Sequence, residues 1–326
     1  MTVTQPLKVF SMDEVQVEEI KWLWYPYIPF GKITLIQGDG GCGKTFSILA
    51  IISALTTGGL LPESDEPLIP SNVIFQTAED GLGDTIKTRL LQLEADCKRV
   101  LVIDDSIQSL SLSDVRIEQT ITEHKAKLLV VDPWHHYLGA NVDMYRANEV
   151  RPILKRIGDV AQRTGCAIIF IGHISKGGDG KSQNRALGSV DTVNASRTVL
   201  SFGKIQDENN PDLYGFAHDK ANLAPKGSSI AYELSKDKGF NWIGAYNISS
   251  YDLFKPPSEN SRPSTALDMA KRFIKDELTS SPILATVMYE KASNHGISER
   301  TLKEAKKALR AKSIKLDNDK RWYWSL

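Results

Sequence analysis

Eight consecutive residues carry the clearest chemical signal in the sequence: Gly38-Asp39-Gly40-Gly41-Cys42-Gly43-Lys44-Thr45. They match the pattern Gly-x-x-x-x-Gly-Lys-Ser/Thr without deviation. In that pattern the glycines turn backbone N–H groups towards phosphate oxygens, the lysine reaches the β- and γ-phosphates, and the hydroxyl takes a position on Mg²⁺. A chance glycine-rich turn is the alternative. Because an apolar run precedes the motif and a helical pattern follows it, we expect a site for a nucleoside triphosphate and Mg²⁺.

Two acidic residues are candidates for the two remaining roles, holding Mg²⁺ and acting as the general base. Asp132 ends an apolar run and has the expected form of the residue that holds Mg²⁺ through its water shell; an acid that merely ends a strand is the alternative. Pro133 follows it, so no adjacent carboxylate can polarise the attacking water. Glu79 follows another apolar run and is the candidate general base, since the carboxyl ends of parallel strands converge on the ligand. Asp80 competes with it, and Glu79 could also be an N-cap or surface acid.

The elements that must position these residues alternate between strand and helix patterns. Short β-branched apolar runs predict strands at 33–37, 73–77, 100–104, 128–132 and 167–172. Helical patterns lie between them at 44–57, 114–123 and 147–163. This alternation indicates an α/β fold, with a mostly parallel sheet covered by helices on both faces. Three later runs without intervening helices predict an antiparallel extension: 198–202, 213–218 and 230–234.

The composition changes near the C-terminus. Residues 255–264 combine three prolines with small polar residues, a composition that cannot bury a core and predicts a linker. We therefore expect one domain at 1–254 and a second at 265–326. The second domain is predicted to contain helices and a closing strand pair, at 266–278, 283–293, 299–312, 314–316 and 322–324.

Charge and cysteine usage narrow the class of protein. Lys plus Arg and Asp plus Glu are 40 each, which argues against a chain that is basic throughout. The balance hides a difference, because residues 265–326 hold 13 basic against 8 acidic residues and the remainder is net acidic. The three cysteines form no disulfide or zinc spacing, which favours a reducing compartment. With neither a secretion signal nor a run long enough to cross a bilayer, we expect a soluble cytoplasmic protein without membrane contact.

Taken together, the motifs resemble the RecA-like ATPases, and within them the RepA-type group of plasmid and phage hexameric replicative helicases. The resemblance covers roughly residues 15–245. Beside the Gly38–Thr45 motif, Glu79 and Asp132, it rests on five segments: 24–30, 77–80, 172–176, 194–197 and 220–225. It implies a RecA-like P-loop NTPase core that uses ATP and Mg²⁺.

The resemblance also implies roles for three further residues. His173 resembles the polar sensor that reports the state of the γ-phosphate, although a lone histidine can simply end a strand. Arg197 resembles an arginine finger inserted into the neighbouring subunit's site; an arginine paired with an acid at the edge of the core is the alternative. Lys220 would be a second trans-acting cation. In a common hexameric-helicase pattern an arginine stands two residues after that lysine, whereas this chain has Asn222, which leaves the finger role to Arg197 or indicates a weaker ATPase.

Two further segments are candidates for contact with nucleic acid. The glycine-rich loop 175–190 carries Lys176, Lys181 and Arg185, and in RecA-like rings such loops line the channel and bind the strand's phosphates. A solvated surface loop is the alternative, and the loop has no aromatic residue for base stacking.

The second segment is the predicted helix after Ser298, a candidate N-cap. At 100° per residue five cations fall on one arc: Arg300, Lys303, Lys306, Lys307 and Arg310. Leu302, Ala305, Ala308 and Leu309 occupy the opposite arc. The succession of helix, turn, cationic helix and hairpin resembles a winged helix-turn-helix, in which residues 322–324 would mostly pack the wing. An ordinary solvated helix of a protein-interaction domain is the alternative.

We therefore predict an ATP-hydrolysing motor that moves on single-stranded DNA, in the form of a hexameric RepA-like replicative helicase. Duplex DNA is a further expected partner, through the C-terminal domain. One alternative is a RecA-like regulator or recombination mediator that binds DNA and ATP without unwinding. A P-loop small-molecule kinase ranks lower, because the 175–190 loop contains only one of the several arginines that a closing lid would need.

Overall fold

The computed structural model describes residues 9–174, 190–207, 209–235, 237, 239–254, 266–278, 282–295, 297–315 and 321–325. The chain divides into two compact units, Met1–Phe254 and Lys255–Leu326. Within the described ranges, no helix combines the length and the apolar character needed to cross a membrane.

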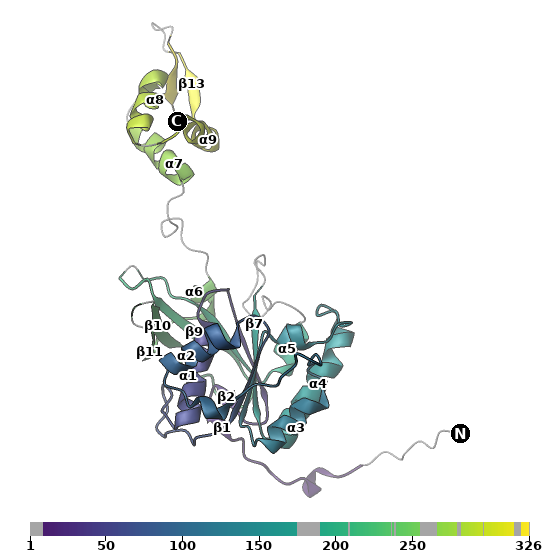
Figure 1. The fold of residues 1–326 in the computed structure, drawn as a ribbon. Helices are drawn as coiled ribbons and strands as arrows, with labels where there is room; N and C mark the ends of the chain where they lie inside the picture. Colours follow the sequence, from purple (N-terminus) through teal and green to yellow (C-terminus); the bar gives the residue numbers. More distant parts are fainter. Residues whose placement is uncertain are drawn as a thin grey trace, which may run out of the picture. The chain divides into compact units, whose positions relative to one another are not determined.

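The large unit is built on a nine-stranded sheet with the order β11-β10-β9-β8-β3-β7-β6-β4-β5 (Figure 1). Its strands are β3 (Ile33–Gly38), β4 (Val73–Thr77), β5 (Val100–Leu101), β6 (Leu128–Asp132), β7 (Ala167–His173), β8 (Thr198–Lys204), β9 (Leu213–Ala221), β10 (Ile230–Ser235) and β11 (Gly239–Ala245). The strands from β8 to β5 are parallel, and those from β8 to β11 pair antiparallel. The predicted α/β class is confirmed: this is a RecA-like P-loop NTPase core with an antiparallel extension.

Helices cover both faces of the parallel strands. On one face α1 (Lys44–Thr57) and α2 (Lys87–Gln92) share a core with alternate strand residues such as Ile36. On the other face α3 (Val115–Glu123), α4 (Ala147–Thr164) and α5 (Val190–Ala195) pack against residues such as Leu35. Strands buried on both faces explain why their sequences are continuous apolar runs rather than alternating ones. A short helix, α6 (Ser250–Phe254), buries Leu253 against β8 and β9.

Several elements of the large unit differ from the predictions. The hairpin β1 (Trp22–Trp24) and β2 (Ile28–Pro29), the helix α2 and the strand β11 were not predicted. In β11, Gly239 and Gly244 interrupt the apolar pattern, and partly buried residues alternate with exposed ones. β5 ends at Leu101 rather than at Asp104, because it pairs with β4 over only two positions.

The small unit contains α7 (Ala266–Glu277), β12 (Ile283–Leu284), α8 (Ala285–Asn294), α9 (Glu299–Ala308), β13 (Lys312–Ile314) and β14 (Tyr323–Ser325). The strands form an antiparallel sheet in the order β12-β14-β13. Leu302 of α9 and Trp324 of β14 lie in its apolar core. The predicted helix 299–312 ends earlier, since Arg310 adopts a left-handed φ of 55°. The first two residues of the predicted helix 283–293 form β12 instead.

Candidate functional site

The glycine-rich motif forms the turn between β3 and α1, at the carboxyl edge of the sheet. Gly41 and Gly43 have φ values of 77° and 78°, in the left-handed region that L side chains rarely adopt. A Cβ at Gly43 would also lie 2.9 Å from Cδ2 of Leu234. The backbone conformation therefore favours glycine at position 43, and a side chain there would also displace Leu234.

Tyr232 of β10 holds this turn from the antiparallel extension. Its hydroxyl donates a 2.6 Å hydrogen bond to the carbonyl oxygen of Cys42, and the side chain is fully buried. Burial also raises the pKa of Tyr232 well above its ordinary value, so the phenol remains a donor. Sequence reasoning missed this contact, because the two residues lie 190 positions apart and an aromatic residue in a strand carries no signal for it.

Lys44 is the first residue of α1, directly after the turn, and is 5% exposed. Its ammonium donates hydrogen bonds to the carbonyl oxygens of Gly38, at 2.9 Å, and Asp39, at 2.8 Å. A buried ammonium needs such acceptors, and the turn itself supplies them. The charge is thereby fixed beside the backbone N–H groups that the motif is expected to turn towards phosphates.

Thr45 and Asp132 meet beside this lysine. The Thr45 hydroxyl donates to Oδ2 of Asp132 at 2.8 Å, across 87 residues of sequence. Burial raises the pKa of the Asp132 carboxyl, the hydrogen bond from Thr45 opposes that rise, and the charge of Glu79 adds to it. A buried carboxylate beside a hydroxyl is a pair of hard oxygen ligands, and Mg²⁺ typically takes one or two protein oxygens together with substrate phosphates and waters. The residues present therefore fit a Mg²⁺ site.

Glu79 and Asp80 follow β4 and differ in their partners. Oε1 of Glu79 lies 3.5 Å from Nε2 of His173, the last residue of β7. Asp80 instead forms a 3.0 Å ion pair with Arg89 of α2. From the sequence, either acid could be the general base. In the structure, Glu79 is the one that faces the predicted sensor histidine.

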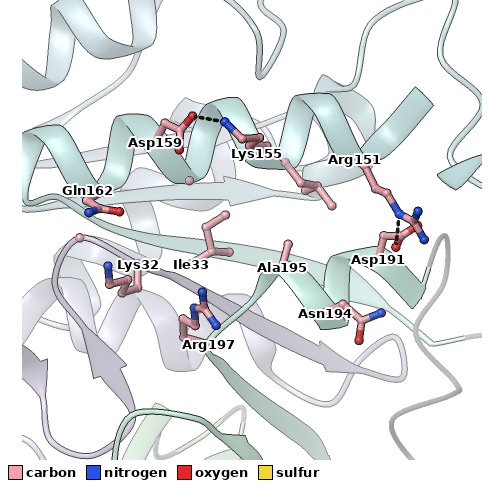
Figure 2. A pocket seen from close by; sticks show the side chains of 13 residues that line it. Lys32, Ile33, Arg151, Lys155, Asp159, Gln162, Asp191, Asn194, Ala195 and Arg197 are labelled. Atoms are coloured by element: carbon pink, nitrogen blue, oxygen red, sulfur yellow. Dashed lines mark hydrogen bonds and ion pairs between the residues drawn. The ribbon is translucent and has the colours of Figure 1, made fainter. Parts of the chain in front are cut away.

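Arg197 and Lys220 lie at the opposite end of the sheet from the glycine-rich turn. Arg197 precedes β8, which runs parallel to β3, and its N–H donates to the Ile33 carbonyl at the start of β3. Its exposed side chain lines a surface recess together with Lys32 (Figure 2). The structure thus does not bring either predicted trans-acting residue to Lys44 of the same chain.

Lys220 is held by its own subunit. Its ammonium donates to three carbonyl oxygens around the end of α5, those of Val193 at 2.7 Å, Asn194 at 3.3 Å and Ser196 at 2.8 Å. Burial, and secondarily the charge of Arg197, lower the pKa of Lys220. These contacts give the lysine a role in fixing the connection from α5 to β8, which sequence reasoning did not anticipate.

The predicted nucleic-acid residues fall into two groups. Lys176, Lys181 and Arg185 lie outside the described residues. The other five lie on or just after α9, and Ser298 caps that helix as predicted by accepting from the Thr301 N–H.

The expected cationic face of α9 needs correction. Arg300 pairs with Glu304 at 3.2 Å and Lys303 with Glu299 at 2.6 Å, so two of the five charges are neutralised along the helix. The Lys306 ammonium lies 4.2 Å from the Trp324 ring centroid. Lys307 is exposed on the helix, and Arg310 lies beyond its end. Ala308, expected on the apolar side, is exposed as well.

The aromatic residues of the predicted wing also differ from one another. Trp324 is buried as expected, whereas Trp322 is 54% exposed, with the Lys315 ammonium 4.8 Å from its ring centroid. The prediction that residues 322–324 mostly pack the wing therefore holds for Trp324 and not for Trp322, which precedes β14 (Tyr323–Ser325) and lies outside the strand.

Comparison with known proteins adds one match to this geometry. Residues 4–179 fit a protein-family model described as an AAA domain, a span that includes the glycine-rich turn, Glu79, Asp132 and His173. A search of the curated proteins found no match.

Proposed function

The chain belongs to the AAA domain family and carries a P-loop ATPase domain, and from this premise we propose that it is an ATP-hydrolysing, DNA-dependent motor of the RepA-like replicative helicase type. One observation carries the hydrolase part of the proposal. Lys44, the Thr45–Asp132 pair and the Glu79–His173 pair all lie at the carboxyl edge of one parallel sheet. That edge is where such sheets bind their ligands.

In this proposal the turn binds the triphosphate of ATP. Lys44 and the N–H groups of residues 40–45 bind the β- and γ-phosphates, and Thr45 with Asp132 holds Mg²⁺. When bound, Mg²⁺ neutralises phosphate charge and polarises the γ-phosphoryl group. The hydrogen bond from the Tyr232 hydroxyl to the Cys42 carbonyl fixes the position of the turn relative to β10. Positioning of this kind accounts for most of the catalysis in phosphoryl transfer.

Glu79 is the proposed general base. Its carboxylate accepts the proton of the water that attacks the γ-phosphorus, while the bond to the bridging oxygen of ADP breaks. The imidazole of His173, 3.5 Å away, orients this carboxylate and is the proposed reporter of the γ-phosphate towards the 175–190 loop. Asp80 is unsuited to the role because Arg89 holds it.

Contact with DNA is proposed for the 175–190 loop, through Lys176, Lys181 and Arg185, and for the small unit. Support for the second comes from the order of its elements, helix, strand, helix, helix and two strands, which is that of a winged helix-turn-helix. Lys307 and Arg310 are its proposed phosphate contacts, together with Arg300, Lys303 and Lys306 if their present partners are exchanged for phosphates.

Assembly into a ring, with Arg197 and Lys220 acting on the neighbouring subunit's ATP, completes the proposal. It is supported by the exposure of Arg197 and by its position away from the turn of its own chain. The extensive contacts of Lys220 make it the weaker of the two candidates.

The deciding experiment measures ATP turnover with and without single-stranded DNA, alongside the mass of the assembly. We expect DNA to stimulate hydrolysis and the mass to be that of a multimer. If the protein is a monomer and hydrolyses ATP at the same rate with and without DNA, the proposed motor is refuted and only the ATPase activity stands. A strand-displacement assay then separates a helicase from a DNA-binding regulator that shares the same site.

A further inference from the structure

The net positive charge of the small unit is concentrated in its last 21 residues. Residues 265–305 hold six basic and six acidic residues, whereas residues 306–326 hold seven basic and two acidic ones. The second stretch therefore carries the whole excess of positive charge, and it comprises the end of α9 and the strands β13 and β14. We expect a polyanion to bind there rather than at the start of α9.

The first part of α9 is neutral along its exposed surface. Arg300 pairs with Glu304 at 3.2 Å, and Lys303 pairs with Glu299 at 2.6 Å, with all four side chains more than half exposed. A helix that enters a groove of duplex DNA places cations against phosphates and base edges. This part of α9 would bring two carboxylates towards the phosphates as well. The start of α9 is therefore poorly suited to a DNA groove.

The end of α9 lies against the strand pair. The Lys306 ammonium donates a 2.5 Å hydrogen bond to the Ser313 hydroxyl of β13 and lies 4.2 Å from the Trp324 ring centroid of β14. These contacts hold Lys306 in place and bring the end of the helix beside β13. Lys307 and Arg310 follow within one turn and are exposed, so their charges lie close to this junction.

Two more exposed lysines accompany the strand β13. Lys312 begins β13 and Lys315 directly follows it, and no described acid forms an ion pair with either. Ile314 pairs with Tyr323, which places Lys315 opposite Trp322 at the ends of the two strands. The Lys315 ammonium lies 4.8 Å from the Trp322 ring centroid, and this tryptophan is 54% exposed. The small unit thus presents an indole ring to solvent with a cation beside it.

The combination of an exposed ring and unpaired cations indicates the class of ligand. Single-stranded nucleic acid offers unpaired bases, which stack on aromatic side chains, and phosphates, which attract lysine. In a duplex the bases are already stacked on one another, so an indole ring can stack on a base only after that base is unstacked. The lysine next to the ring adds a cation–π contribution to the same platform. The surface therefore suits an unpaired strand better than a duplex.

We propose that the small unit binds single-stranded DNA along β13 and the end of α9, with one base stacked on Trp322 and phosphates bound by Lys315, Lys312, Lys307 and Arg310. The inference rests on the proposed function and deepens it, because it assigns an unpaired strand to the small unit where the order of its elements alone suggests a duplex. A motor of this kind holds the separated strand at two places, the 175–190 loop and the small unit.

The first test maps the contact in the full-length chain. The probe is an oligothymidine that carries one photoreactive 5-iododeoxyuridine, used either as a single strand or annealed to its complement. After irradiation, the cross-linked residues are identified by mass spectrometry. We expect a cross-link to Trp322 with the single strand, at a yield about tenfold or more above that with the duplex. No cross-link at Trp322, or equal yields from both probes, would overturn the proposal.

The second test measures affinity for the unmodified oligothymidine in a background chain whose loop cations are removed, so that the small unit's contact is observed without the loop. Trp322→Ala should weaken binding by about tenfold or more, and Trp322→Phe should restore most of it, because a phenyl ring keeps a stacking face. Tyr251→Ala, at a 72% exposed aromatic residue of the large unit, is the matched control and should leave affinity unchanged. Equal binding by the Trp322→Ala and background chains, or a background chain that binds no strand, contradicts the inference. The background carries Lys176→Ala, Lys181→Ala and Arg185→Ala.

The salt dependence of binding distinguishes stacking from charge. Each phosphate contact that is lost reduces the slope of log K against log salt by about 0.7 for a single strand. Lys312→Ala and Lys315→Ala should each show this reduction, whereas Trp322→Ala should lower the affinity with the slope unchanged. Arg300→Ala, at an exposed cation that is already paired with Glu304, should change neither. A loss of affinity from Arg300→Ala with none from Lys312→Ala would assign the contact to the start of α9 and refute the inference.

ATP hydrolysis by the parent chain separates this inference from the proposed function. A parent that hydrolyses no ATP would refute the proposed motor, whatever its small unit binds. A parent that is a DNA-stimulated ATPase, but whose binding of the strand is independent of Trp322, would refute only the assignment of the small unit.

Discussion

Replacement of Glu79 by Gln tests the assignment of the general base. The change keeps the shape of the side chain and removes its ability to accept a proton. A positioned general base contributes about 10²–10⁴-fold to a rate. We therefore expect kcat for ATP hydrolysis to fall by that factor, which corresponds to about 3–5 kcal/mol in the activation barrier.

The structure indicates that no neighbour can replace Glu79. Asp80, the nearest acid in sequence, is held 3.0 Å from Arg89, and Asp132 is 5% exposed and bonded to Thr45. The loss should therefore approach the upper part of the range. ATP affinity should change little, because the proposed phosphate contacts come from Lys44 and the turn.

The assay is single-turnover hydrolysis of ATP, with ATP affinity measured separately by equilibrium binding. Asp80→Asn is the matched control: it removes the neighbouring carboxylate and should leave kcat within a few-fold of the parent. A Glu79→Gln chain that hydrolyses ATP normally refutes the reasoning. So does an Asp80→Asn chain that loses hydrolysis while retaining its fold.

Three further changes test how the site is built. Tyr232→Phe leaves the buried Cys42 carbonyl without its donor and should lower the free energy of unfolding by about 1–3 kcal/mol, measured by denaturant titration against Tyr214→Phe as control. Gly43→Ala should destabilise by at least about 1–2 kcal/mol because of its positive φ, whereas Gly40→Ala, with open space around it, should not. Asp132→Asn should stabilise the metal-free chain. Burial raises the pKa of the Asp132 carboxyl in the folded state above 3.8. The stability that this group gives the parent chain is therefore present below pH 3.8 and is lost as the pH rises through the folded-state pKa. Melting temperatures in a chelating buffer should then favour the Asn chain more at neutral than at acidic pH, and a constant difference would contradict this.

The sequence was most informative where local chemistry and burial coincide. The bounds of α1 match the prediction because glycines end the strand before it and Gly58, with a φ of 79°, ends the helix. The bounds of β6 match because an apolar run buried on both faces ends at one acid. In these elements the signal lies within a few neighbouring residues.

Contacts between distant segments could not be predicted in this way. The bond from Tyr232 to Cys42 and the ion pair of Asp80 with Arg89 depend on how β10 and α2 pack against the rest of the large unit. The strand β10 was predicted from its local pattern, but its packing was not. α2 is six residues long and follows a π-helical turn, so its periodicity is too short to be recognised. The contacts of Lys220 could not be predicted either, because the residues next to a lysine in the sequence do not indicate which carbonyl oxygens it will bind.

The neutral total charge conceals a separation that bears on the proposed contact with DNA. The small unit has an excess of basic residues, yet Arg300 and Lys303 already pair with acids one helical turn away. Among the residues described near α9, fewer cations are therefore exposed and unpaired than a helical projection suggests. The main ones are Lys307 and Arg310. Since paired surface charges contribute little and unpaired ones attract partners, the positions of the unpaired charges locate the contacts better than the net charge of either unit.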